Sequence, residues 1–312
     1  MKQGNDSTVT EFILVGFTDI PQLQIVLFIL FLGIFIFTVS ANVIIISTVR
    51  AEPSLHKPMY FFISNFSFME MCYTTALIPK MMAGVLTGNK FISVQSCIIQ
   101  FYCIFAFGAA INFLLAVMSY DRYLAICHPF HYMTIMSNAV CGYLASFAWT
   151  AGLFAPVMPA IWISTLYFCG PQKIDHFFCD FAPVVNLSCT DTSIVEITFF
   201  IFSWTIILGC FFFTMISYVH IISAVLQIQS PFGRQKTFST CTSHLTVVSI
   251  YYGTAIFMYV RPTARTTFHW DKLVSIFYSM VTPLFNPIIY SLRNQEVKKA
   301  LRKVISRHHK QT

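Results

Sequence analysis

Polar and ionisable side chains that interrupt long apolar stretches are the residues of this sequence best suited to chemistry. An ionisable group inside a hydrocarbon layer is costly, so it must face a partner or water, and such groups mark ion sites, proton relays and switches. The alternative is that each joins neighbouring helices through hydrogen bonds worth about 0.6 kcal/mol apiece. In chain order these residues are Asn42, Glu70, Asn112, Asp121, Arg122, His244 and Asn286.

Glu70 lies in an apolar stretch that has no Lys or Arg near its centre. A carboxylate in that position either stays protonated or meets a cation. A neutral carboxyl group and a bound sodium ion are the two physical options, and the sequence alone does not choose between them. Glu70 is therefore a candidate ion or switch site. For Asn42 and Asn286, helix joining and a functional role both stay open.

Asp121 and Arg122 are an adjacent acid and base at the end of an apolar stretch. Such a pair can exchange partners when helices move, as a two-state latch requires. The alternative is an ordinary anchor pair at the membrane boundary, and spacing alone favours that alternative.

The motifs of the common enzyme classes do not occur in the sequence. It contains no Gly-rich phosphate loop with a Lys, no His-Glu-x-x-His and no Gly-x-Ser-x-Gly. The catalytic motifs of the common hydrolases, kinases and metalloproteases are therefore absent from the sequence. We therefore expect neither an enzyme nor a cofactor.

The elements that must position these side chains are membrane helices. Of the 312 residues 56% are hydrophobic and 10% charged, whereas a soluble domain is about 25% charged. Stretches of about 20 apolar residues, enough to cross a bilayer, predict an all-α membrane protein, a seven-transmembrane helix bundle. Loops are short except for roughly 30 residues after the fourth stretch, which leaves no room for a soluble catalytic domain. The predicted spans are 23–49, 58–83, 97–128, 139–163, 194–227, 236–260 and 270–292.

Basic residues in the C-terminal segment, 293–312, predict that this end is cytoplasmic and that the segment 1–22 is extracellular. Basic residues in the loops do not support this orientation by count. Two other features agree with it: a glycosylation sequon at Asn5, and three cysteines in the long loop assigned to the oxidising side. The residues Gln295 to Val304 have helical apolar spacing with basic residues between, which predicts a short amphipathic eighth helix on anionic lipid rather than a nucleic-acid site.

Four long motifs resemble those of the odorant (olfactory) receptor family of rhodopsin-like (class A) G-protein-coupled receptors. They occur in that family's order and spacing and together align the whole chain. The motifs are LHKPMYFFISNFS from Leu55, MSYDRYLAICHPFHY from Met118, KTFSTCTSHL from Lys236 and PLFNPIIYSLRN from Pro283.

The resemblance implies roles for residues of the predicted cytoplasmic half. Asp121, Arg122 and Tyr123 resemble the activation latch, whose Arg helps to open a cleft for a G protein. Asn286, Pro287 and Tyr290 resemble the seventh-helix switch, and Pro287 would loosen that helix by removing a backbone hydrogen bond. Tyr218 resembles the tyrosine that meets this switch. Ser239 to His244 resembles the inner motif of the sixth helix.

The resemblance also implies two disulfides on the predicted outer side, Cys97 with Cys179 and Cys169 with Cys189. The even number of outer cysteines favours pairing, although some could remain free. The segment from His176 to Asp180 has residue types suited to a soft metal, but a disulfide at Cys179 would remove its best ligand. The other six cysteines are expected to pack as reduced apolar groups.

A ligand pocket in the outer half of the bundle follows from the same resemblance. Ile104 stands where amine receptors carry a carboxylate, so a charged amine is a poor ligand, and a small alcohol, aldehyde, ketone or ester suits the lining better. The expected lining residues are Ile104, Phe105, Gly108, Ala109, Phe202, Ser203, Ile206, Tyr252, Ala255, Tyr259, Ser275 and Ser279.

One residue departs from the family pattern. Ile111 stands where many odorant receptors have a second acid, which puts a sodium ion at Glu70 in doubt, although Asn112 beside it is a polar group that could partly substitute.

The function predicted from these features is that of an odorant receptor. A small volatile, mostly apolar ligand would activate a stimulatory, olfactory-type G protein and raise cyclic AMP. The expected location is the plasma membrane, in the cilia of olfactory sensory neurons, with a possible trafficking chaperone as a further partner. Alternatives are a receptor of this architecture used outside the nose, and a small transporter or channel that uses Glu70 in an ion path.

Overall fold

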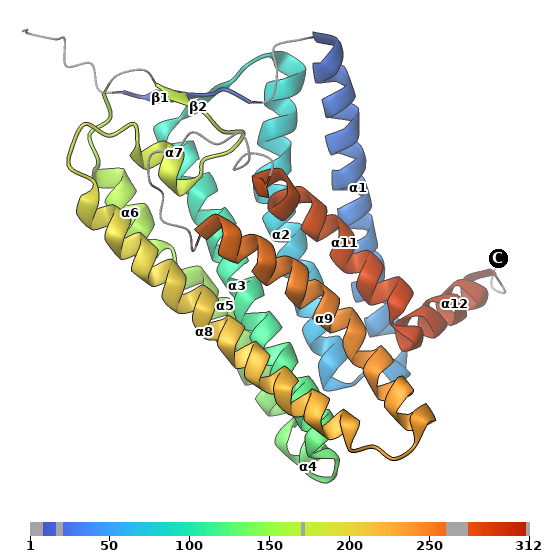
Figure 1. Ribbon diagram of the computed structural model, residues 1–312. Coiled ribbons are helices and arrows are strands. Elements are labelled where there is room, and N and C mark those ends of the chain that lie inside the picture. The colour runs from blue at the N-terminus through green and yellow to red at the C-terminus, as the bar shows by residue number, and fades with distance from the viewer. Residues whose placement is uncertain (1–8, 17–20, 170–171, 260–273, 310–312) are drawn as a thin grey trace, which may run out of the picture.

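The structure, a computed structural model, describes residues 9–16, 21–169, 172–259 and 274–309. It is a bundle of long helices with a small sheet at one end (Figure 1). The opposite end, where α12 leaves the bundle, is called the α12 end below. The long helices are α1 (Pro21–Ala51), α2 (Pro58–Thr87), α3 (Val94–Cys127), α5 (Asn138–Phe154), α6 (Val157–Thr165), α8 (Ser193–Leu226) and α9 (Pro231–Tyr259).

The predicted seventh span lies partly outside the described residues. Its described part ends in three consecutive pieces: a π-helical turn η2 (Phe277–Val281), α11 (Thr282–Ile288) and a second π-helical turn η3 (Ile289–Arg293). Amphipathic α12 (Gln295–His309) follows. At the same end lie η1 (Pro53–Leu55) and α4 (Pro129–Ile135).

Four helical segments in the described part are long and apolar enough to cross a membrane: Gln22–Ala51, Val94–Cys127, Asn138–Thr165 and Ser193–Leu226. The third combines α5 and α6, which are separated at Ala155 and Pro156. The remaining predicted spans correspond to α2, which carries Glu70 and Lys80, to α9, whose first turns are polar, and to the incompletely described seventh.

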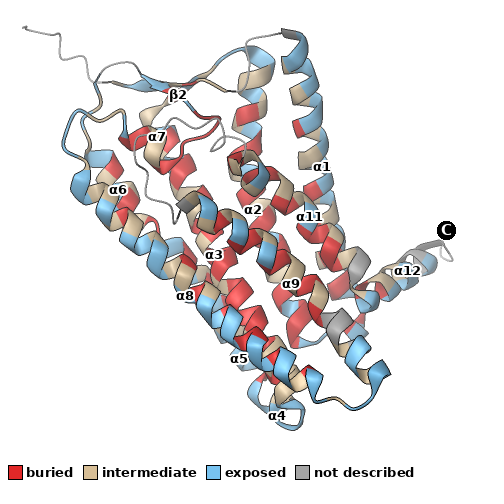
Figure 2. Ribbon diagram, in the orientation of Figure 1, coloured by how far each residue is buried: buried red, intermediate tan, exposed pale blue. Residues whose placement is uncertain are grey.

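Helix α3 is the centre of the bundle. In the most apolar 18-residue stretch of α3, 67% of the residues are buried, against 22% in α1 and 17% in α8. Helix α3 contacts α2, α5 and α8. Figure 2 shows the corresponding pattern, with buried residues turned inward and exposed residues on the outer helix faces. Exposed apolar side chains such as Ile25 and Ile29 suit a lipid environment.

Local sequence signals explain where α3 and α5 begin and why these two helices can lie close together. Ser93 and Ser137 cap α3 and α5 by accepting hydrogen bonds from Ser96 N and Val140 N. A Cβ atom at Gly152 would lie 2.5 Å from the Ala110 backbone, so only glycine allows α5 to approach α3 this closely.

The sheet has the order β2-β1-β3. Strand β1 (Glu11–Leu14) pairs antiparallel with β2 (Phe91–Ser93) and parallel with β3 (Lys173–Ile174). Phe12 and Leu14 of β1 are buried in a cluster with Cys97 and Cys179. The N-terminal segment is thereby packed against the loops that cover this end of the bundle, together with the short helix α7 (Phe181–Val185).

Candidate functional site

A cavity of about 70 Å³ lies between α3, the α5–α6 segment, α8 and α9, in the half of the bundle nearer the sheet. Most of its lining is aliphatic or aromatic, and none of the lining residues is charged. The lining consists of Ile104, Phe105, Gly108, Ala109, Asn112, Ala155, Pro156, Pro159, Phe199, Phe202, Ser203, Ile206, Ile207, Tyr251, Ala255 and Tyr278.

Eight of the pocket residues expected from the sequence lie in this lining: Ile104, Phe105, Gly108, Ala109, Phe202, Ser203, Ile206 and Ala255. Tyr252 does not line the cavity; its ring packs against Phe211. Ser275 and Ser279 are buried elsewhere, where Ser275 contacts His176 and Ser279 donates to the Ser275 carbonyl. The side chain of Tyr259 lies outside the described residues.

Lining residues that sequence reasoning missed come mainly from the α5–α6 break and from two tyrosines. Tyr251 donates a 2.7 Å hydrogen bond to the Gly108 carbonyl, which ties α9 to α3. Asn112 donates from Nδ2 to the Ile206 carbonyl at 3.4 Å. For these residues the sequence offered one signal: Asn112 carries a polar amide within an otherwise apolar helix.

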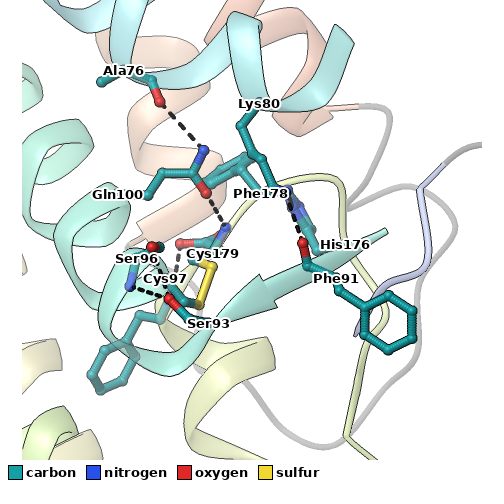
Figure 3. The surroundings of a disulfide bond; sticks show 12 residues. Ala76, Lys80, Phe91, Ser93, Ser96, Cys97, Gln100, His176, Phe178 and Cys179 are labelled. Atoms are coloured by element: carbon teal, nitrogen blue, oxygen red, sulfur yellow. Dashed lines mark hydrogen bonds between the residues drawn. A yellow bond between two sulfur atoms is a disulfide. The ribbon is translucent and has the colours of Figure 1, made fainter. Parts of the chain in front are cut away.

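A disulfide and a group of phenylalanines cover the cavity on the sheet side. Cys97 is bonded to Cys179, with Cα atoms 5.5 Å apart. Gln100 lies beside the bridge: its Oε1 accepts from Cys179 N at 3.1 Å and its Nε2 donates to the Ala76 carbonyl at 3.3 Å (Figure 3). Gln100 thus joins α2, α3 and the loop, a role that sequence reasoning did not assign.

Aromatic rings continue from the bridge to the cavity. Phe181 stacks on Phe199 with ring centroids 3.6 Å apart, and Phe199 meets Phe105 edge-on at 5.4 Å. The second bridge joins Cys169 to Cys189, with Cα atoms 5.8 Å apart. The described cysteines at the other six positions are free. Asn5, the predicted glycosylation site, lies outside the described residues.

A second group of buried polar side chains, outside the cavity lining, surrounds Glu70 of α2. The carboxyl group accepts a hydrogen bond from Asn286 Nδ2, while its second oxygen has no partner among the described residues. Asn42 donates to its own helix, to the Thr38 carbonyl. In the part of the chain that the structure describes, no group of three His, Cys, Asp or Glu side chains could hold a metal ion. The arrangement joins α2 to the seventh helix.

At the α12 end of α3, Asp121 accepts a 2.8 Å hydrogen bond from Tyr132 of α4. No ion pair between Asp121 and Arg122 occurs among the described contacts, and Arg122 Nε is buried without a hydrogen-bond partner. Tyr123 contacts His128 Nε2 at 3.0 Å. The Arg122 guanidinium is therefore only partly engaged in this arrangement.

Four further residues assigned to the switch region lie in the same half. Tyr218 and His244 share a hydrogen bond of 2.5 Å between the hydroxyl and Nδ1. The Tyr290 hydroxyl is buried with no partner among the described residues. Pro287 lies within α11, between the two π-helical turns. The side chain of Ser239 is not described.

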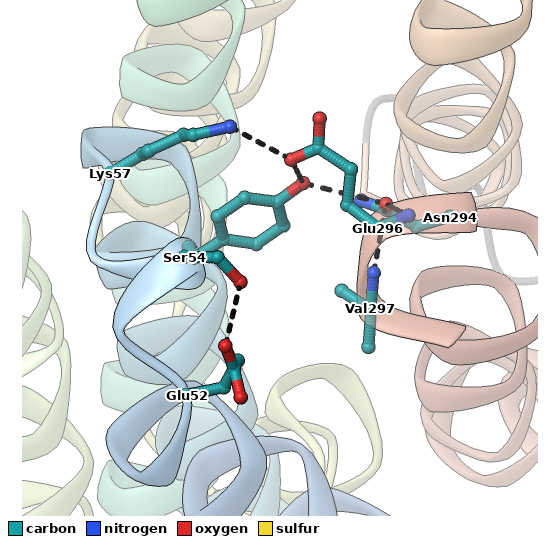
Figure 4. Close-up of polar contacts among 7 residues, drawn as sticks. Glu52, Ser54, Lys57, Asn294, Glu296 and Val297 are labelled. Atoms are coloured by element: carbon teal, nitrogen blue, oxygen red, sulfur yellow. Dashed lines mark hydrogen bonds and ion pairs between the residues drawn. The ribbon is translucent and has the colours of Figure 1, made fainter. Parts of the chain in front are cut away.

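Two ion pairs hold α12 against the loop that links α1 to α2. Lys57 Nζ lies 3.0 Å from Glu296 Oε2, which also accepts a 2.8 Å hydrogen bond from the Tyr60 hydroxyl (Figure 4). Lys303 Nζ lies 2.8 Å from Glu52, whose side chain is only 3% exposed. Sequence reasoning did not assign these residues, because the two halves of each pair are far apart in the chain.

The charge on Glu296 is favoured by its surroundings. Partial burial raises its pKa, but hydrogen bonds from Lys57 and Tyr60 and the charge of Lys57 together outweigh the burial. The pKa of Glu296 therefore lies below its ordinary value.

Comparison with known proteins connects this geometry to a family. The model of the family described as "Olfactory receptor" matches residues 31–308. The chain is 46% identical to Olfactory receptor 226 of Rattus norvegicus, with 97% of this chain and 94% of that protein covered. It is 47% identical to human Olfactory receptor 6F1 (97% and 98% covered) and 48% identical to human Olfactory receptor 6B1 (97% of each covered).

Proposed function

Since the chain belongs to the olfactory receptor family of seven-transmembrane receptors, we propose that it binds a small, mostly apolar volatile ligand and activates a stimulatory, olfactory-type G protein. Activation would raise cyclic AMP. The relatives are receptors, a class of proteins that is not enzymatic.

The single observation that carries the ligand class is the uncharged lining of the cavity between α3 and α8. A carboxylate there would favour an amine, and a guanidinium would favour an acid. An aliphatic and aromatic lining with a few hydroxyl and amide groups instead favours a neutral small molecule held by shape and one or two hydrogen bonds.

Coupling to the G protein is proposed for the opposite end of the bundle. In this reading Arg122 is the moving part of the latch, and Asp121, Tyr123, Tyr218 and His244 hold the arrangement at rest. Asn286, Pro287 and Tyr290 form the seventh-helix switch. The partly engaged Arg122 guanidinium supports this reading, because it can take new partners at little cost.

The receptor is a membrane protein, and we place it in the plasma membrane, in the cilia of olfactory sensory neurons. The segment 1–22, with glycosylation at Asn5, faces outside. The receptor domain spans 23–292, and 293–312 forms the cytoplasmic eighth helix and tail, which would contact anionic lipid. A trafficking chaperone is a further proposed partner. A sodium ion at Glu70 is an additional proposal that rests on one carboxyl group and its amide neighbour Asn286.

The test is a cyclic-AMP assay in cells that express the full chain, with a mixed panel of small volatile odorants and short carboxylic acids. A saturable response that disappears in Arg122→Ala, with the variant still on the cell surface, would support the proposal. Arg50→Ala, an exposed arginine at the end of α1, is the matched control and should keep the response. Silence of the surface-expressed wild type across the panel would count against an odorant of these classes.

A further inference from the structure

We propose that Asn112 is the polar anchor of the cavity and that it selects ligands that carry a hydroxyl group, above all small aliphatic alcohols. This inference rests on the proposed function, because it specifies the ligand class for the same cavity. It narrows a pocket suited to alcohols, aldehydes, ketones and esters to the first of these classes.

Asn112 is 2% exposed and borders the cavity. Its Nδ2 donates to the Ile206 carbonyl of α8 at 3.4 Å, and its Oδ1 accepts no hydrogen bond from any described residue. This contact also fixes the orientation of the amide, since a flipped amide would set two oxygens against each other. A buried carbonyl oxygen without a donor is a cost in the empty receptor that a suitable ligand can remove.

The other polar side chains of the lining do not require a hydrogen-bond donor from the ligand. The Tyr251 hydroxyl already donates to the Gly108 carbonyl, and the Tyr278 hydroxyl is hydrogen-bonded to Tyr251. The Ser203 hydroxyl can either donate or accept, so it does not distinguish an alcohol from a carbonyl compound. Among the described lining side chains, Asn112 Oδ1 is thus the buried polar atom that has no hydrogen-bond partner.

The unpaired Asn112 oxygen determines which functional group of a ligand fits the cavity. An alcohol can donate its O–H to Asn112 Oδ1 and still accept from Ser203. Aldehydes, ketones, esters and ethers carry acceptors only, so they would leave Oδ1 without a donor and place a second oxygen near it. Sites built to hydrogen-bond a hydroxyl discriminate strongly against analogues that lack it.

The position of Asn112 also orients the ligand. Among the lining residues of α3, Asn112 is the one farthest from the Cys97 end, and it lies eight positions after Ile104. At about 1.5 Å per residue this spans about 12 Å. The hydroxyl would therefore lie at the deep end of the cavity, with the alkyl chain toward Phe105 and Phe199.

The experiment measures binding without relying on signalling. The full-length receptor, purified in lipid nanodiscs, is melted with increasing 1-butanol, 1-hexanol or 1-octanol, and with the aldehyde and the methyl ether of equal heavy-atom number. The proteins are wild type, Asn112→Leu, Asn112→Ala and Thr205→Val. Thr205 is the matched control, because its hydroxyl is exposed on α8 and bonds only its own helix at Ile201. Asn112→Ala serves if the leucine variant does not fold.

At least one alcohol should stabilise the wild type and the Thr205 variant, and the ether should do so about tenfold more weakly. Loss of the amide should weaken alcohol affinity by about tenfold, which corresponds to about 1.4 kcal/mol. The proposal is overturned if no alcohol shifts the melting temperature of the wild type, if ethers bind as well as alcohols, or if the Asn112 variants keep full affinity. Cyclic AMP recorded with the same panel separates the two proposals, since alcohol binding without signalling would contradict the receptor function alone.

Discussion

The Tyr218 hydroxyl and His244 Nδ1 lie 2.5 Å apart and join α8 to α9 within the α12 end of the bundle. His244 is fully buried, and its Nε2 has no partner among the described residues. The two rings lie nearly parallel, with an interplanar angle of 26°. This contact therefore resists separation of α8 and α9 at the α12 end, the movement that would open a cleft for a G protein in the proposed function.

Replacing His244 by Phe should raise ligand-independent signalling. The substitution keeps a ring but removes the hydrogen-bond partner of Tyr218, and a hydrogen bond of this kind contributes about 0.5–1.5 kcal/mol. Basal cyclic AMP should rise about 2- to 10-fold at equal surface expression. Ser217→Ala is the control, since Ser217 bonds only its own helix at Phe213. An unchanged or lower basal level in His244→Phe would contradict a restraining role for the contact.

The Cys97–Cys179 bridge should be required for a stable receptor. Its sequence separation is 82 residues, and loss of a native disulfide commonly costs about 2–5 kcal/mol. Cys179→Ser should remove most surface staining, whereas Cys72→Ser, which changes a free cysteine, should leave it near the wild-type level. Normal surface staining of Cys179→Ser would show that the loop folds without the bridge.

The two ion pairs of α12 should differ in strength. Lys303→Ala removes the ammonium from a carboxylate that is 3% exposed, while Lys57→Ala breaks a pair in which both side chains are more than half exposed. Hydrogen bonds between charged groups in buried sites contribute about 1.5–3 kcal/mol, and exposed pairs about 0.2–1 kcal/mol. The melting temperature should fall more for Lys303→Ala. Lys299→Ala, at an exposed position on the same helix, is the control. If its melting temperature fell as far as that of Lys303→Ala, the effect would come from changing α12 and not from breaking the ion pair.

The Glu296 contacts should be sensitive to acid. The folded pKa of Glu296 is lowered, so its stabilising contribution is fully present above the unfolded pKa of about 4.3 and is lost as the pH falls through the folded pKa. Glu296→Gln should melt below the wild type at neutral pH, with a difference that shrinks below about pH 4. The measurement is the melting-temperature difference between the two proteins from pH 7 to pH 3. A constant difference over this range would mean that the charge of Glu296 does not matter.

Much of the architecture could be predicted from apolar runs alone. A run such as Gln22–Ala51 has no stable place except lipid or a protein core, whatever its neighbours are. The four family motifs gave the order of the helices and the general position of the pocket. Helix ends were less accurate: α9 begins at Pro231, five residues before the predicted span, because polar residues can extend a helix beyond the apolar layer.

The rotation of each helix was harder to predict. Tyr251 faces the cavity and Tyr252 packs against Phe211, although helical spacing from Ala255 allows either. In the seventh helix, Ser275 and Ser279 do not line the cavity: Ser275 contacts His176, and Ser279 donates to the Ser275 carbonyl.

The sequence by itself determined that this chain is a helical membrane receptor, because composition and contiguous motifs are local properties of the chain. Only the tertiary structure decided which polar atoms are paired. Glu52 meets Lys303 across 251 positions, and Asn112 directs its donor to Ile206 and leaves its acceptor unpaired. These outcomes depend on how helices pack and turn against one another, and a difference of one residue in phase rotates a side chain by about 100°.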